Sequence, residues 1–199
     1  IIGESLHKTL QPQASFVLMD QKSGEVKAIS GGRGQKTASL TLNRASGTYR
    51  QPGSTFKILT AFAPAIDTCG ATLGSVYYDS IYTVGNKTFS NWYSSGYQGY
   101  SSIRDGIIYS MNIVAVRCLM ETVTPQLGVE YAKNFGISSL TDTDYNPALA
   151  LGGITTGVSN LELTGSFATI ANGGVYKKPI FFTRILDHDG KVLIDNTPE

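Results

Sequence analysis

A turn followed by a helical apolar pattern constrains the fold of this chain more than any other stretch of its sequence. Pro52 and Gly53 mark the turn. The apolar residues that follow recur at helical spacing and comprise Ile58, Ala61, Phe62, Ala65 and Ile66. We therefore expect a helix that begins near Ser54 and runs to about Thr68. A kink is expected at Pro64, because proline has no N–H to bond the carbonyl four residues back.

The first turn of this expected helix carries a serine and a lysine, Ser54 and Lys57, three residues apart. Residues at this spacing share one helix face. Unpaired N–H groups and the positive end of the dipole favour an alkoxide at a helix start, and a lysine removed from water can lose its proton near neutral pH. The pair predicts a serine nucleophile with a lysine base. Taken alone, it also fits a serine N-cap followed by a solvated lysine.

The composition is typical of one soluble globular domain. Of the 199 residues, 41% are hydrophobic and 16% are charged, which is enough for one sizeable core. The net charge of +1, without a basic run interleaved with aromatic residues, argues against nucleic acid as a partner. No apolar run reaches the ~20 residues that span a bilayer. Cys69 and Cys118 lack metal-binding spacing, so a disulfide and two free thiols both remain open.

Alternating and capped segments predict a mixture of strands and helices. Residues Gln13 to Ser30 are expected to form an antiparallel hairpin with one face against a core. Residues 70–99 are expected to form a long loop region with short strands, and two further strand-like runs flank the turn at Asp189 and Gly190. The expected helices comprise the end of one in residues 1–10, then 102–110, 113–123, 124–136 and 159–174, with capping boxes at Ser102 with Asp105 and Ser159 with Glu162.

A second candidate element is the pair Ser110 and Asn112, at the join between two expected helices. On their own such residues are ordinary local hydrogen bonders. Beside Ser54, however, Ser110 offers a hydroxyl that can relay a proton, and Asn112 offers an amide that can hold Lys57 and a substrate carbonyl. Trp92, in the aromatic loop region, could line a substrate groove, although loop aromatics most often pin a loop to its own core.

Other chemistries fit the sequence poorly. His7 and His188 lie near opposite ends and are expected at the surface, not in a triad or a zinc pair. His188 with its two aspartate neighbours is expected to be a solvated hairpin turn, so no metal site is predicted. The segment GGRG at residues 31–34 lacks a dinucleotide or phosphate-loop pattern. No cofactor is expected.

Together these residues resemble the transpeptidase domain of bifunctional, class A, penicillin-binding proteins, whose signature includes SxxK and an SxN motif. The likeness is carried by LNRAS at 42–46, RQPGSTFK at 50–57, SIRDGIIYSMNIVAVR at 102–117, NPALALGG at 146–153 and NLELTGSFATIANGGVYKKP at 160–179. It covers nearly the whole chain in matching order. The resemblance implies an α+β fold, an α/β sandwich in which helices flank a central antiparallel sheet beside an all-helical subregion, as in beta-lactamases and transpeptidases.

The resemblance also implies an acyl-serine mechanism without a cofactor. Ser54 would attack the penultimate D-alanyl carbonyl of a peptidoglycan stem peptide, with Lys57 as base, and its backbone N–H would serve as one oxyanion donor. Ser110 would return the proton to the departing D-alanine, and Asn112 would hold Lys57 and bind substrate. A second stem peptide would then accept the acyl group, and beta-lactam antibiotics would acylate Ser54 and inhibit the enzyme. The implied location is the outer face of the bacterial cytoplasmic membrane, extracellular or periplasmic.

The chain departs from this family in one respect: no KTG or KSG follows the SxN motif. Thr155, Thr156 and Gly157 have Ile154 where the lysine would stand, and the one KSG, at 22–24, precedes Ser54. We therefore expect residues 1–199 to be the N-terminal part of a single transpeptidase domain, with an incomplete sheet. The glycosyltransferase domain, the membrane anchor and the KTG strand would lie outside this sequence, and the remaining segment, as a second chain, would complete the sheet.

Three other functions remain open from the sequence. A beta-lactamase of the SxxK superfamily needs a deacylating base, yet Tyr145 to Leu151 contains no acidic residue. A DD-carboxypeptidase would use water in place of the acceptor amine. A non-enzymatic antibiotic sensor would acylate and catalyse nothing further.

Overall fold

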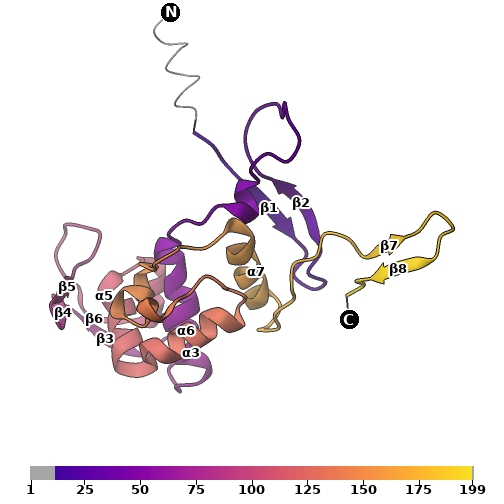
Figure 1. The fold of residues 1–199 in the computed structure, drawn as a ribbon. Helices are drawn as coiled ribbons and strands as arrows, with labels where there is room; N and C mark the ends of the chain where they lie inside the picture. Colours follow the sequence, from indigo (N-terminus) through magenta and orange to yellow (C-terminus); the bar gives the residue numbers. More distant parts are fainter. Residues whose placement is uncertain (1–11, 199) are drawn as a thin grey trace, which may run out of the picture. The chain divides into compact units, whose positions relative to one another are not determined.

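The computed structural model describes residues 12–198 and divides into two compact units (Figure 1). One unit contains the described residues up to Tyr49 together with those from Ser159 on, and the other is the continuous segment Arg50–Val158. The helix end expected in residues 1–10 lies outside the described residues. Within residues 12–198, no helix has the length and apolar character that a bilayer crossing requires.

The first unit is built on the expected hairpin. Strands β1 (Phe16–Met19) and β2 (Val26–Ser30) pair antiparallel, so the prediction is confirmed. Asp20 shapes the turn, because its carboxylate accepts the backbone N–H of Lys22 at 2.9 Å and of Ser23 at 3.0 Å. On one face of the hairpin, Phe16 and Leu18 are more than half exposed. The hairpin therefore keeps an uncovered apolar face within the described chain.

Helix α7 (Asn160–Ala171) packs against β1, and the short helix α2 (Arg44–Gly47) packs against α7 (Figure 1). The predicted capping box at the start of α7 is present: the Ser159 hydroxyl accepts the N–H of Glu162, and the Glu162 carboxylate accepts the N–H of Ser159. The last hairpin, β7 (Arg184–Leu186) and β8 (Val192–Asp195), is antiparallel as predicted.

The second unit is mainly helical. After the 3-10 turn η1 (Gly53–Thr55), its helical elements comprise the π-helix η2 (Ile58–Phe62), α3 (Ala63–Asp67), α4 (Ile103–Ile108), α5 (Asn112–Arg117), the π-helix η3 (Cys118–Val123), α6 (Pro125–Asn134), and the 3-10 turns η4 (Asp142–Asp144) and η5 (Pro147–Leu151). Its fully buried apolar side chains include Phe56, Leu59, Phe62, Ile103, Ile113, Val114, Leu119 and Leu149. The helices expected within residues 102–136 are therefore present, and the elements of this unit enclose one core.

The helix expected over residues 54–68 is present, but it is not one regular α-helix. It passes from η1 through η2 to α3, and the N–H of Ala63 bonds the carbonyl of Ile58, five residues back. Pro64 lies in the first turn of α3 and has no N–H to bond a carbonyl of the preceding turn. The proline is thus accommodated by a change of helical register beside it.

The loop region expected over residues 70–99 holds short strands, as predicted. Strand β3 (Val76–Asp79) pairs antiparallel with β6 (Gly99–Ser102), and β4 (Tyr82–Val84) pairs with β5 (Lys87–Phe89). Each named sheet in residues 12–198 has two strands. The α+β class is confirmed, and the central sheet of the expectation is represented in the described chain by separate antiparallel pairs.

Candidate active site

The amine of Lys57 is the centre of the candidate site. Its side chain is 2% exposed. The Nζ donates to the backbone carbonyl of Ser110 at 2.6 Å, to the Ser110 hydroxyl at 3.0 Å and to Oδ1 of Asn112 at 2.7 Å. The structure thus brings together three of the four predicted catalytic residues, from segments more than fifty positions apart.

Burial changes the acid–base behaviour of this amine. It lowers the pKa of Lys57 from 10.5 to about 8, because the buried site disfavours the charged form. No carboxylate pairs with Lys57 among residues 12–198 to oppose this effect. A lysine with this pKa is partly neutral near physiological pH and can accept a proton from a neighbouring hydroxyl.

Ser54 lies one helical turn before Lys57, in η1, and is exposed. The turn that carries it is held by the segment after η5. Arg50 and Val158 exchange backbone hydrogen bonds of 3.0 Å and 2.8 Å, and the Gln51 amide bonds both the N–H and the carbonyl of Ile154. Ser54 is therefore exposed to solvent on a turn whose neighbouring backbone is hydrogen-bonded to the segment after η5.

Two glycines make this anchoring possible. A Cβ on Gly157 would lie 2.6 Å from the backbone of Arg50, and a Cβ on Gly152 would overlap the backbone of Gly53. Both glycines also have positive φ, at 88° and 69°. The segment following η5 can therefore approach the Ser54 turn only because it has no side chain at these two points.

Ser110 has a backbone conformation that is unusual for serine, with a φ of 49° in the left-handed region. It sits between α4 and α5, and the capping box predicted for α4, Ser102 with Asp105, is present. The left-handed turn directs both the carbonyl and the hydroxyl of Ser110 to the Lys57 amine. Local strain at a residue with two contacts to one ionisable group is typical of a functional site.

Asn112 is held on three sides at the start of α5. Its Nδ2 donates to the carbonyl of Ser90 at 3.0 Å, and its backbone N–H donates to Oδ1 of Asn91 at 2.9 Å. These contacts leave the side-chain oxygen facing Lys57. Sequence reasoning missed Asn91, and it also missed the buried Asp79, which accepts from Asn91 at 2.7 Å. The available signal was an aspartate at an inward-facing position of β3, whose exposure alternates.

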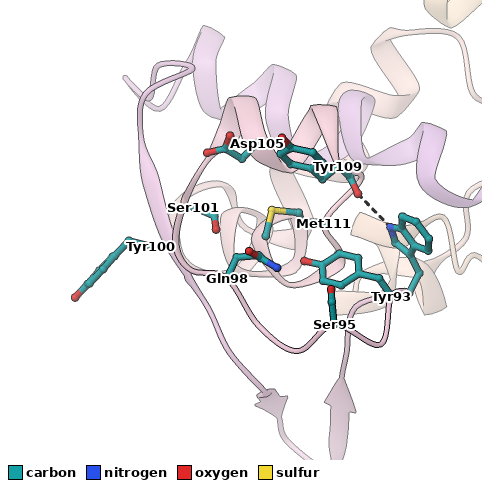
Figure 2. A pocket seen from close by; sticks show the side chains of 9 residues that line it. Tyr93, Ser95, Gln98, Tyr100, Ser101, Asp105, Tyr109 and Met111 are labelled. Carbon is teal, nitrogen blue, oxygen red and sulfur yellow. Dashed lines mark hydrogen bonds between the residues drawn. The ribbon is translucent and has the colours of Figure 1, made fainter.

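Trp92 lies in the loop after β5 and is 70% exposed. Its Nε1 donates to the carbonyl of Tyr109, the C-cap residue of α4, at 3.1 Å. It lines a cleft whose other walls are Tyr93, Ser95, Gln98, Tyr100, Ser101, Asp105, Tyr109 and Met111 (Figure 2). Met111 stands between Ser110 and Asn112 in sequence, so this cleft adjoins the candidate catalytic turn.

The sequence assigned Asp187, His188 and Asp189 to an ordinary hairpin turn. Asp187, His188 and Asp189 form the turn of the last hairpin, with ligand atoms within 4.8 Å of one another. The Asp187 carboxylate accepts the N–H groups of Asp189 and Lys191, as a turn aspartate does.

The sequence left open whether Cys69 and Cys118 form a disulfide or remain free thiols. In the structure both are free thiols.

Comparison with known proteins places the fold and the sequence in one family. PonA1 of Mycobacterium tuberculosis, in a structure described as its complex with penicillin V, superposes with a TM-score of 0.79 and 25% identity, covering 97% of this chain and 54% of that chain. Penicillin-binding protein 1A of Clostridium tetani is 37% identical, and penicillin-binding protein 1F of Bacillus subtilis is 38% identical. Each alignment covers 94% of this chain and 25% of the relative.

Residues 14–198 match the family described as the penicillin binding protein transpeptidase domain. The chain belongs to this family. It spans about a quarter of the length of the curated relatives that it matches.

Proposed function

We propose that this chain supplies the nucleophile, base and proton relay of an acyl-serine DD-transpeptidase that cross-links peptidoglycan stem peptides. The observation that carries the proposal is the buried Lys57 amine, held by Ser110 and Asn112 one helical turn after Ser54. Membership of the penicillin-binding transpeptidase family supports the same chemistry.

In the first step, the Ser54 hydroxyl attacks the carbonyl of the penultimate D-alanine, and its proton passes to the neutral amine of Lys57. The backbone N–H of Ser54, in the first turn of the helical segment, is one donor to the resulting oxyanion. Collapse of the tetrahedral intermediate breaks the peptide bond and releases D-alanine, whose nitrogen takes a proton by way of Ser110. The amine of a second stem peptide then attacks the acyl-enzyme carbonyl and gives a proton to Lys57, and Ser54 leaves and takes this proton back to re-form its hydroxyl.

The contacts of Lys57 give Ser110 a distinctive capacity for this relay. A charged lysine has three N–H donors, and all three acceptors around Nζ are oxygen atoms. When the amine becomes neutral, one acceptor must face its lone pair. A carbonyl oxygen cannot donate to that lone pair, whereas the Ser110 hydroxyl can rotate and do so. Of the three groups that accept from Lys57, the Ser110 hydroxyl is therefore the one that can also exchange a proton with it.

The environment of the Tyr145–Leu151 segment argues against a beta-lactamase. A beta-lactamase needs a carboxylate free to activate water. The nearest acidic residue in sequence, Asp144, is buried and accepts from the backbone N–H groups of Thr141 and Thr155, both at 2.7 Å, and from their hydroxyls. Its oxygens are engaged in holding this turn to the segment after η5.

We further propose that residues 1–199 are the N-terminal part of one transpeptidase domain. The remaining KTG-bearing segment of the same domain, as a second chain, supplies the rest of the oxyanion site. In the same proposal a glycosyltransferase domain and a membrane anchor belong to the longer protein, which acts on the outer face of the cytoplasmic membrane. Beta-lactams are the expected inhibitors, and Trp92 contributes to substrate binding through the cleft that it lines.

The test is the intact mass of the full-length protein after incubation with penicillin, for the wild type, Ser54→Ala and Lys57→Arg. We expect a one-to-one adduct on the wild type, none on Ser54→Ala, and a strongly slowed adduct on Lys57→Arg, because arginine does not deprotonate in this range. An adduct that persists in Ser54→Ala would overturn the assignment. Cross-linking of lipid-linked precursor, set against D-alanine release and cephalosporin hydrolysis, separates a transpeptidase from a carboxypeptidase and a beta-lactamase.

A further inference from the structure

The geometry points to Asn91 and Asp79 as positioning residues for the base Lys57, an inference that rests on the proposed function. The observation behind it is the start of α5. Oδ1 of Asn91 accepts the N–H of Asn112 at 2.9 Å and the N–H of Ile113 at 3.3 Å. Met111, the residue at the N-cap position, makes no side-chain cap. Asn91 therefore caps this helix from a loop about twenty residues earlier in the chain.

Asp79 fixes which end of the Asn91 amide faces the helix. Its carboxylate is buried and accepts Nδ2 of Asn91 at 2.7 Å, the N–H of Gln98 at 2.8 Å and the hydroxyl of Tyr93 at 3.3 Å. A carboxylate can only accept hydrogen bonds when it is ionised, so it selects the NH₂ end of the amide. The oxygen of Asn91 is left to cap α5.

The chain of contacts ends on the residue that accepts from the base. The loop at residues 90–91 bonds both the backbone N–H and the side-chain Nδ2 of Asn112, while Oδ1 of Asn112 accepts from Lys57. Asn91 and Asp79 make none of the hydrogen bonds to the Lys57 amine. Their role is to hold Asn112, and through it the amine, in the geometry that deprotonation and proton return require.

Loss of the cap has a distinctive consequence for the base. Without Asn91 the first turn of α5 frays, Asn112 withdraws, and water reaches the amine. Burial is what lowers the pKa of Lys57 to about 8, so hydration raises it again. The titratable groups on the chain of contacts are Asp79 and Tyr93, and Asn91→Ala replaces neither of them. A shift in the pH dependence of acylation therefore reports on Lys57.

The experiment measures acylation by a fluorescent penicillin from pH 6.5 to 9.5, together with thermal unfolding, in the full-length protein. The variants are Asn91→Ala, Asp79→Asn and their combination. Thr124→Ala is the matched control, because Thr124 caps α6 in the same unit through its side chain, accepting the N–H of Leu127 at 3.3 Å. Ser54→Ala gives the background.

For Asn91→Ala we expect acylation at pH 7.5 to fall at least tenfold and the midpoint of its pH profile to rise. The acylation rate of Asp79→Asn is expected to fall at least threefold, and this substitution is expected to add nothing in the Asn91→Ala background. Thr124→Ala is expected to lose about as much thermal stability as Asn91→Ala, while its acylation rate stays unchanged. Wild-type acylation and an unshifted profile in folded Asn91→Ala overturn the inference. If that variant does not fold, the same result in the nearly isosteric Asp79→Asn overturns it. Failure of the wild type itself to acylate refutes the proposed function instead.

Discussion

The substitution Asn112→Asp tests whether the neutral form of Lys57 is the base. In the structure, Oδ1 of Asn112 lies 2.7 Å from Nζ of Lys57, and the residue carries no charge. A carboxylate at this position forms an ion pair that favours the ammonium, and such a partner raises the pKa of a lysine by roughly 2. The change is nearly isosteric, so the acid–base equilibrium is the property most altered.

The size of the effect follows from the fraction of neutral amine. With a pKa of about 8, roughly a quarter of Lys57 is neutral at pH 7.5. A pKa raised by roughly 2 leaves about 0.3% neutral at that pH and about a quarter at pH 9.5. We therefore expect acylation to fall about 80-fold at pH 7.5 and about fourfold at pH 9.5.

The assay is the second-order rate of acylation by a fluorescent penicillin at both pH values, with Asn112→Ala as the uncharged control. Both variants lose the amide's hydrogen bond to the Ser90 carbonyl, so Asn112→Ala measures what this loss does to the rate at each pH. The further deficit of Asn112→Asp relative to Asn112→Ala, compared at the two pH values, isolates the charge effect. If Asn112→Asp shows the same deficit at both, the neutral-lysine mechanism is refuted.

Three further predictions concern the frame of the site and the thiols. Gly152→Ala should destabilise the protein by about 2–4 kcal/mol in denaturant unfolding and slow acylation, because its Cβ meets the Gly53 backbone at a φ of 69°; an unchanged midpoint would contradict the close approach. Ser110→Gly should leave thermal stability equal or higher, since glycine relieves the strain at a φ of 49°, yet reduce acylation on the order of 100-fold; a stable, fully active variant would exclude the relay. Burial raises the pKa of the Cys118 thiol to about 11, so a disulfide reagent at pH 8 should react with Cys69 alone in the native protein and with both thiols after unfolding. Two reactive thiols in the native protein would contradict the buried placement of Cys118.

The features that the sequence predicted well depend on local patterns. The two capping boxes and the terminal hairpins are formed by residues within a few positions of one another, so their signals are complete in short windows. Spacing alone likewise placed Lys57 one helical turn after Ser54, although it could not reveal that the lysine amine would be buried.

The features that the sequence did not predict depend on tertiary approach. The left-handed turn at Ser110 and the close approach of Gly152 to Gly53 are set by segments distant in the chain. Asn91 gave no local signal because the helix that it caps begins 21 residues later. The π-helical register before Pro64 was not predicted either. A proline indicates that a helix is interrupted, but it does not specify which hydrogen-bond register the backbone adopts there.

The backbone bridge between Arg50 and Val158 has a consequence for engineering. The whole Lys57 network, from Asp79 to Asn112, lies in the continuous segment between these two residues. Their mutual hydrogen bonds hold the entry and exit of that segment side by side. The segment is therefore a cassette with adjacent ends, which can be exchanged between related proteins through two junctions or circularly permuted by joining them. Such chimaeras would show which enzymatic properties are transferred with the segment that contains Lys57 and which depend on the recipient protein.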